Sequence, residues 1–128
     1  MAKVLIVDDK DEFLQEEELE TAHMGHGMLH RGFLVALFNE KKDLLVAKRS
    51  GLKLLWPGSW DGSVAGHVYP GEDYESAARR RIREEVGLTI DTLEPITKFR
   101  YQAQFSLGLA ENEICMLYLA RTPEKITP

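Results

Sequence analysis

A single amphipathic helix, predicted from about Tyr74 to Val86, limits the fold of this chain more than any other feature. Pro70-Gly71-Glu72-Asp73 opens it, and Gly87 stands where a C-terminal cap is expected. Its apolar residues recur at helical spacing along one stripe, which must face a core. Strand-like segments lie on both sides of the helix: Val4–Val7, Gly32–Phe38 and Leu44–Lys48 before it, and Thr97–Gln104 and Ile114–Arg121 after it. This order predicts a mixed α+β sheet domain and not a regular βαβ alternation.

The chain has 128 residues and contains no repeat, linker or low-complexity tract, so we interpret residues 1–128 as a single domain. One part of it has no clear pattern. The segment Glu12–Glu20 is rich in acids and carries little apolar character, so it fits a second strand or a short helix equally well.

Composition and charge exclude several classes of function. With 16 basic and 21 acidic residues the net charge is -5, so the chain lacks the basic surface that nucleic-acid binding needs. Apolar runs such as Met116–Ala120 are too short to cross a bilayer, so we expect no membrane partner. The single cysteine, Cys115, excludes an internal disulfide framework, and the chain opens on a strand with no secretory signal. These features predict a cytoplasmic protein.

Imidazoles and carboxylates gather in three segments. His23, His26 and His30 share one segment, and His67 follows Gly66 directly. Glu111-Asn112-Glu113 precedes the last strand, where residues two apart point the same way, so both carboxylates can reach one ion. Histidines and carboxylates together would form a nitrogen–oxygen site suited to zinc, manganese or magnesium. Taken singly, each histidine is more simply a surface or loop residue, and the spacing alone does not bring the segments together.

The helix and the loop before it resemble the Nudix box. The matching positions are Gly66, Glu72, Arg80, Ile82, Glu84, Glu85, Gly87 and Leu88. The helix pattern by itself also fits an ordinary amphipathic helix whose arginines, from Arg79 to Arg83, form a solvated face with surface salt bridges. In Nudix proteins this loop–helix–loop holds a divalent cation through helix carboxylates, and the cation binds a diphosphate. The one exception is Arg81, where Nudix hydrolases carry a metal-binding glutamate; a cation there is suited to contact diphosphate oxygens directly.

Over nearly its whole length the chain resembles the type I isopentenyl-diphosphate isomerases, a branch of the Nudix fold. The similar segments are LHRGFLVALFN, LLVAKRS, WPGSW, GH followed by GE, ARRRIREEVGL, FRYQA and ENEIC. The resemblance implies a Nudix fold, with a mixed β-sheet around the Nudix-box loop–helix–loop. Family members continue past the position of Pro128, so a C-terminal element of the fold is expected to be missing here.

The resemblance also assigns roles to particular residues. It implies a metal site, for manganese, zinc or magnesium, whose ligands are His23, His30, His67, Glu111 and Glu113. Glu85 takes the second metal position, which holds magnesium together with the substrate diphosphate. The basic residues that bind the diphosphate are Arg49, Lys53 and Arg81. Tyr101 matches the active-site tyrosine, and Glu113 doubles as a proton-transfer group.

The chain also departs from this family. The position of the essential cysteine, two residues before the GH histidine, is Ala65; Cys115 aligns with an ordinary strand cysteine, and Leu19 replaces a basic residue. Three functions therefore stay open. The chain is an isomerase that is impaired or uses another proton donor, a Nudix hydrolase that cleaves a nucleoside or prenyl diphosphate, or a diphosphate-binding module without turnover. The substrate is in each case a small diphosphate, and the sequence leaves the oligomeric state open.

Overall fold

The computed structural model describes residues 2–39, 42–45, 47–48, 60–61, 63–106 and 108–122. Their elements, in chain order, are β1 (Lys3–Val7), β2 (Phe13–Glu18), α1 (Leu19–Ala22), β3 (His30–Phe38), β4 (Ala47–Lys48), β5 (Trp60–Asp61), β6 (Val64–His67), α2 (Tyr74–Val86), β7 (Glu94–Ser106) and β8 (Leu109–Arg121). The mixed α+β prediction is confirmed. The undecided segment, residues 12 to 20, forms strand β2 and then enters the one-turn helix α1.

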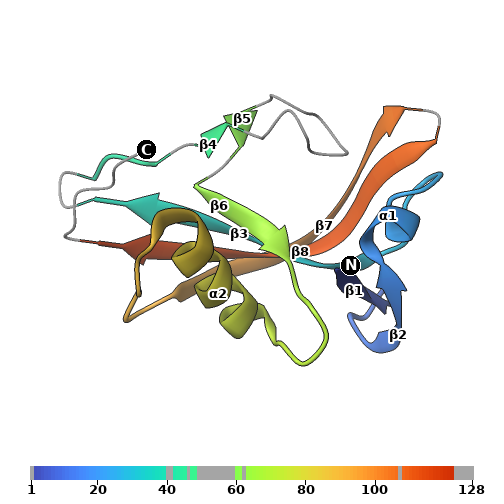
Figure 1. Ribbon diagram of the computed structural model, residues 1–128, viewed down its shortest axis with the longest axis horizontal. Coiled ribbons are helices and arrows are strands. Elements are labelled where there is room, and N and C mark those ends of the chain that lie inside the picture. Colours follow the sequence, from blue (N-terminus) through green and yellow to red (C-terminus); the bar gives the residue numbers. More distant parts are fainter. Residues whose placement is uncertain are drawn as a thin grey trace.

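Six strands form one twisted sheet (Figure 1). Their order is β2-β1-β3-β8-β7, and β6 pairs with β3 beside β1. The central pair, β3 and β8, runs parallel with His30 opposite Glu113, whereas the other pairs of this sheet are antiparallel. A parallel pair needs a long crossover, and here the chain between these two strands contains β6, α2 and β7. The pairing therefore brings residues 30 and 113 side by side.

The predicted helix matches α2, and its ends explain its bounds. The Asp73 carboxylate accepts a hydrogen bond from the Ser76 amide at 2.7 Å, while the Ser76 hydroxyl accepts one from the Asp73 amide at 3.0 Å. Gly87 closes the helix with φ at 70°, a left-handed conformation that glycine adopts at little cost. Within the described residues no helix is long and apolar enough to span a membrane.

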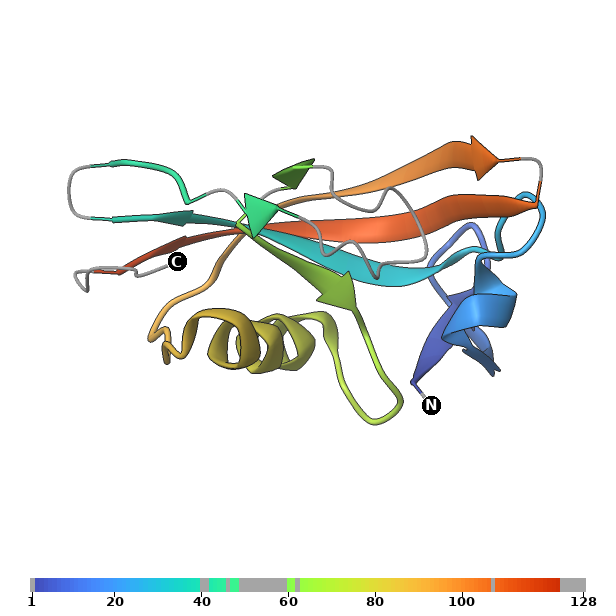
Figure 2. The same ribbon diagram turned by 45° about the horizontal axis from the view of Figure 1, so that its top comes forward.

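The sheet has two different faces (Figure 2). Helix α2 covers one of them, and there Ala77, Ala78 and Ile82 pack against Phe33 and Val35 in the main core. Because successive strand residues point to opposite sides, the alternate residues of β6, β3, β8 and β7 point away from α2. The strand register places the following residues on this second face: Ala65 and His67 of β6, Gly32 and Leu34 of β3, Glu111, Glu113 and Cys115 of β8, and Phe99 and Tyr101 of β7. We call this second face the site face.

Candidate metal-binding active site

Five predicted metal ligands come together at one end of the site face. His23 directly follows α1, His30 begins β3, His67 ends β6, and two glutamates lie in β8. One ligand atom from each of His23, His30, His67 and Glu111 lies within 4.8 Å of the others. The three histidine Nε2 atoms lie 3.0, 3.2 and 3.8 Å from Oε1 of Glu111. Oε2 of Glu113 lies 3.8 Å from His30 Nε2 and 3.9 Å from His67 Nε2.

Backbone carbonyls fix two of the imidazole rings. His23 Nδ1 donates to the Leu19 carbonyl at 2.9 Å, and His30 Nδ1 donates to the Met28 carbonyl at 2.8 Å. Since a carbonyl only accepts, each Nδ1 carries the proton, and in the neutral ring Nε2 presents a lone pair to the carboxylate of Glu111. Two lone pairs at this separation repel each other unless a proton or a cation lies between them. In metal-binding histidines, too, one ring nitrogen commonly donates to a backbone carbonyl while the other binds the metal.

Two further observations fit a divalent cation. Among the described residues, Nε2 of the fully buried His30 has no well-aligned hydrogen-bond partner, although Oε1 of Glu111 lies only 3.2 Å away. A Cβ atom at Gly32 would lie 1.9 Å from Oε1 of Glu113, so the missing side chain leaves the space that this carboxylate fills. Nitrogen and oxygen donors in this number suit zinc, manganese or magnesium. The role of these residues as ligands remains a prediction, which the geometry supports.

Two groups of the cluster, His67 and Glu111, are held in the protonation states that metal binding requires. Burial lowers the pKa of His67 to about 4, against the smaller opposing effect of its hydrogen bond to Glu111. Burial would raise the pKa of Glu111, but hydrogen bonds with His23, His30 and His67 outweigh it and hold this pKa well below its usual range. Neutral imidazoles and an ionised carboxylate are the forms that coordinate a cation.

Tyr101 lies beside the cluster. It is directly opposite Glu113 in the antiparallel β7–β8 pair, where side chains on the same face are close neighbours. Its ring stacks on that of Phe99, with 5.8 Å between centroids, and both rings are more than a third exposed on the site face. Ala65 pairs with Leu34 on the same face and supplies no titratable group, while Cys115 is buried there. The site thus combines a carboxylate, a phenol and aromatic rings.

The predicted diphosphate-binding residues are only partly covered by the structure. Arg49 and Lys53 lie outside the described residues. Arg81 forms an ion pair with Glu84 at 3.3 Å and a second one with Glu85. The Cγ atom of Arg81 lies 3.6 Å from the place of a Cβ atom at Gly66, so this arginine packs beside the residue that precedes His67. Glu85 lies on the exposed side of α2, and it is not among the four residues whose ligand atoms converge.

The prediction that the arginines of α2 form a solvated face is wrong for Arg80. Its guanidinium donates to Glu72 at 2.7 and 3.2 Å and to the His67 carbonyl at 3.0 Å, and it lies 4.2 Å from the centroid of the Tyr69 ring. It therefore ties the loop after β6 to the helix. The sequence did carry a signal for this role of Arg80, because Arg80 and its partner Glu72 both match positions of the Nudix box.

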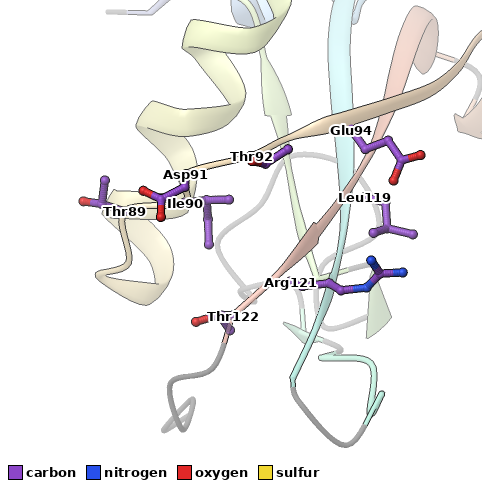
Figure 3. Close-up of a pocket in the computed structure, with 8 residues that line it drawn as sticks. All are labelled: Thr89, Ile90, Asp91, Thr92, Glu94, Leu119, Arg121 and Thr122. Atoms are coloured by element: carbon purple, nitrogen blue, oxygen red, sulfur yellow. The ribbon is translucent and has the colours of Figure 1, made fainter.

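A separate pocket lies away from the cluster, between the segment after α2 and the end of β8 (Figure 3). It is lined by Thr89, Ile90, Asp91, Thr92, Glu94, Leu119, Arg121 and Thr122. Its lining combines acidic, basic, hydroxyl and apolar side chains, and none of the predicted site residues takes part.

Comparison with known proteins supports the resemblance. The family model of the NUDIX domain matches residues 28–128. The isopentenyl-diphosphate Delta-isomerase of Klebsiella pneumoniae is 40% identical over 126 residues, covering 98% of this chain and 68% of the relative. The enzyme of that name from an Enterobacter species is 41% identical over 128 residues, covering 98% and 70%.

Solved structures agree on the fold. The crystal structure of DR0079 from Deinococcus radiodurans superposes with a TM-score of 0.74 at 25% identity, covering 97% of this chain and 74% of that one. The MutT protein of Methanosarcina mazei has a TM-score of 0.61 at 20% identity, covering 77% and 68%. The predicted Nudix fold is confirmed. The chain therefore belongs to the Nudix family and, within it, to the family of the isopentenyl-diphosphate Delta-isomerases.

Proposed function

We propose that this chain interconverts isopentenyl and dimethylallyl diphosphate in a metal-dependent reaction. The observation that carries the proposal is the convergence of His23, His30, His67 and Glu111 beside Glu113 and Tyr101 on the site face. Identity of 40% over nearly the whole chain to proteins named isopentenyl-diphosphate Delta-isomerase supports this reaction.

In this proposal the cationic side chains hold the diphosphate. The side chain of Arg81 packs beside Gly66, the residue before His67, and Arg49 and Lys53 are predicted to add two more positive charges. Planar guanidinium groups form paired hydrogen bonds with phosphate oxygens, which fixes the orientation of the substrate. Glu85 is proposed to hold magnesium together with the diphosphate. The ion pairs of Arg81 with Glu84 and Glu85 would then rearrange toward the substrate.

The isomerisation moves a proton between two carbon atoms. One carbon of the double bond is protonated, the positive charge develops on its tertiary neighbour, and a proton leaves the next carbon, so the overall composition is unchanged. A divalent cation bound by the histidines and Glu111 would fix and polarise the carboxyl group of Glu113. In this proposal Glu113 transfers the proton, Tyr101 is its cross-strand neighbour, and the faces of Phe99 and Tyr101 stabilise the cation.

A Nudix hydrolase is the second candidate, and specific residues favour it. Ala65 leaves one side of the substrate without an acid or base, and Glu84 and Glu85 supply the helix carboxylates that a hydrolase needs. Arg81 opposes this reading, because it stands where hydrolases carry a third carboxylate and neutralises the other two. The histidine–glutamate cluster also has no evident use in diphosphate cleavage.

Phosphorus NMR separates the two functions. With magnesium and manganese present, we expect isopentenyl diphosphate to convert to its isomer with the diphosphate intact, whereas a hydrolase releases phosphate or pyrophosphate from it or from a nucleoside diphosphate. Arg81→Glu should raise KM for isomerisation at least tenfold, because it removes a phosphate contact worth about 1.5–3 kcal/mol. Arg83→Glu, an exposed change on the same helix, is the matched control and should leave KM unchanged. Phosphate release without isomerisation would refute the proposal.

A further inference from the structure

Asn112 separates the two glutamates of the cluster, and its side chain points the other way. Because β8 alternates, the amide lies on the side of the strand opposite the carboxylates of Glu111 and Glu113. Only 8% of the residue is exposed. Nδ2 donates a hydrogen bond to the Gly27 carbonyl at 3.0 Å, and Oδ1 has no hydrogen-bond partner among the described residues. A buried amide whose oxygen is left without a hydrogen bond costs stability, so the one bond that it makes calls for an explanation.

That bond reaches the segment that joins two of the histidines. Gly27 lies between His23 and His30, in a left-handed conformation with φ at 81°. A Cβ atom at Gly27 would lie 3.0 Å from Cβ of Asn112, so the segment packs directly against β8 at this point. A bulkier residue in either place would separate the two.

The next carbonyl along the chain orients a ligand. Met28 follows Gly27, and its carbonyl accepts the hydrogen bond from Nδ1 of His30 at 2.8 Å. The Met28 amide in turn donates to the Ala22 carbonyl at 2.7 Å, and the His23 carbonyl accepts from the Ala110 amide at 2.8 Å. The segment is thus held at both ends by the backbone and in its middle by the Asn112 side chain.

We propose that Asn112 is a positioning residue for the metal centre. By fixing the Gly27 carbonyl it fixes the following peptide, whose carbonyl turns the His30 ring so that Nε2 faces Glu111. One short stretch of β8 then provides two ligands on one face and the support for the histidine segment on the other. The inference rests on the metal-dependent function proposed above, and it adds a residue that does not touch the cation.

Cobalt(II) titration of the metal-free protein tests this role without any substrate. Loss of an outer-shell partner typically weakens metal binding about 10–100-fold, so Asn112→Ala should raise the Kd by that factor and change the visible absorption bands that report coordination geometry. Asn112→Asp is the sharper variant. It keeps the shape and adds a negative charge, which by itself would tighten cation binding, but its oxygen would repel the Gly27 carbonyl. We expect weaker binding for this variant too.

The matched control is Gln102→Ala. Gln102 donates from exposed β7 to the His26 carbonyl at 2.6 Å, in the same segment but away from the carbonyl that orients His30. It should keep the wild-type Kd and spectrum. Thermal unfolding in a chelator shows whether each variant is folded. If the first two variants fail to fold, Asn112→Ser replaces them: it removes fewer atoms, its hydroxyl cannot reach the Gly27 carbonyl, and we again expect weaker cobalt binding.

Two results would overturn the proposal, and they differ. Tight cobalt binding with an unchanged spectrum in the folded Asn112 variants would show that the residue is only structural. Unchanged cobalt binding in His30→Ala would show instead that the cluster is not the metal centre, and the proposed function would fall with it.

Discussion

At the scale of single residues, Glu111 is the centre of the site. All three imidazole Nε2 atoms lie within 3.8 Å of one of its oxygens, in surroundings that exclude most of the solvent. A buried carboxylate is costly unless it is compensated by positive charge or hydrogen bonds. Protons or a cation must therefore balance this charge. The protonation of the cluster therefore depends on pH, and His67 is the histidine of the cluster whose pKa is lowered.

Acid should destabilise the metal-free protein through His67. Its pKa of about 4 in the folded chain lies below the ordinary value of 6.5, so between these values the unfolded chain binds a proton that the folded chain does not. The free energy of unfolding therefore falls as pH falls through this window, by about 3 kcal/mol in total. Urea unfolding in a chelator measures the slope. His67→Gln should flatten it and the exposed His26→Gln should not; equal slopes in all three proteins would contradict the assignment.

By the resemblance to the isomerases, Ala65 stands at the position of their essential cysteine. It lies on the site face, two residues before His67 and opposite Leu34. We predict that Ala65→Cys raises the isomerisation rate about 100-fold or more, because a positioned acid or base contributes about 10²–10⁴-fold. Steady-state kinetics with isopentenyl diphosphate measures the gain. Cys115→Ala, at a buried position, should change the rate only slightly, and a large loss there would show that Cys115 is the proton donor instead.

Sequence reasoning reached the five clustered residues because the resemblance supplied what the spacing lacked. Two spacing rules, alternation in a strand and neighbouring positions on a helix, placed Glu111 with Glu113 and Arg81 with Glu85. Asn112 was not predicted to matter, and the only signal for Arg80 was its match to the Nudix box. Their carbonyl partners, Gly27 and His67, are distant in sequence, and a backbone carbonyl leaves no trace in residue type.

At the scale of elements, Asp11 connects the turn of the β1–β2 hairpin to the centre of the fold. The Asp11 carboxylate accepts hydrogen bonds from Arg31 at 2.8 Å, Lys98 at 2.8 Å and Tyr74 at 3.0 Å. These partners belong to β3, β7 and the first turn of α2. Burial would raise the pKa of Asp11, but the three hydrogen bonds outweigh it and lower this pKa. One carboxylate therefore joins the hairpin to three elements of the main fold.

Removal of this charge should loosen the hairpin. Asp11 has φ at 63°, and asparagine tolerates that conformation, so Asp11→Asn changes the charge without straining the backbone. We expect the free energy of unfolding to fall by about 2 kcal/mol, as for other partly buried charge-assisted bonds. Asp9→Asn is the matched control, because its pair with Arg100 is exposed and should contribute less than about 0.5 kcal/mol. Equal losses in the two variants, measured by urea unfolding, would contradict this account.

The helix was easier to predict than the hairpin. In α2 the caps, the apolar stripe and the flanking turn all agree, so local signals determine the element. The acid-rich segment behind Asp11 has no such agreement, since β2 is exposed along nearly all of its length. Its strand conformation comes from pairing with β1, in a register from Lys3 opposite Glu18 to Val7 opposite Phe13. Strand propensity depends on such tertiary partners.

At the scale of the whole molecule, the two faces of the sheet have different roles. One packs against α2 and supplies the core, and the other carries the buried cluster together with the partly exposed rings of Tyr101 and Phe99. The parallel β3–β8 pair joins them, because it places His30 beside Glu113 on one face and Phe33 and Val35 on the other. Sequence order alone predicted the mixed sheet, but not which strands lie next to each other, since crossover pairing depends on the complete fold.

Deuterium incorporation tests the central claim most directly. The protein is incubated with isopentenyl diphosphate, magnesium and manganese in heavy water, and NMR follows the carbon-bound deuterium together with the phosphorus signals. We predict dimethylallyl diphosphate that carries deuterium in a methyl group and has an intact diphosphate. In Glu113→Gln we expect neither the isomer nor the deuterium label to form. Substrate recovered without deuterium, or cleaved to phosphate, would contradict the account.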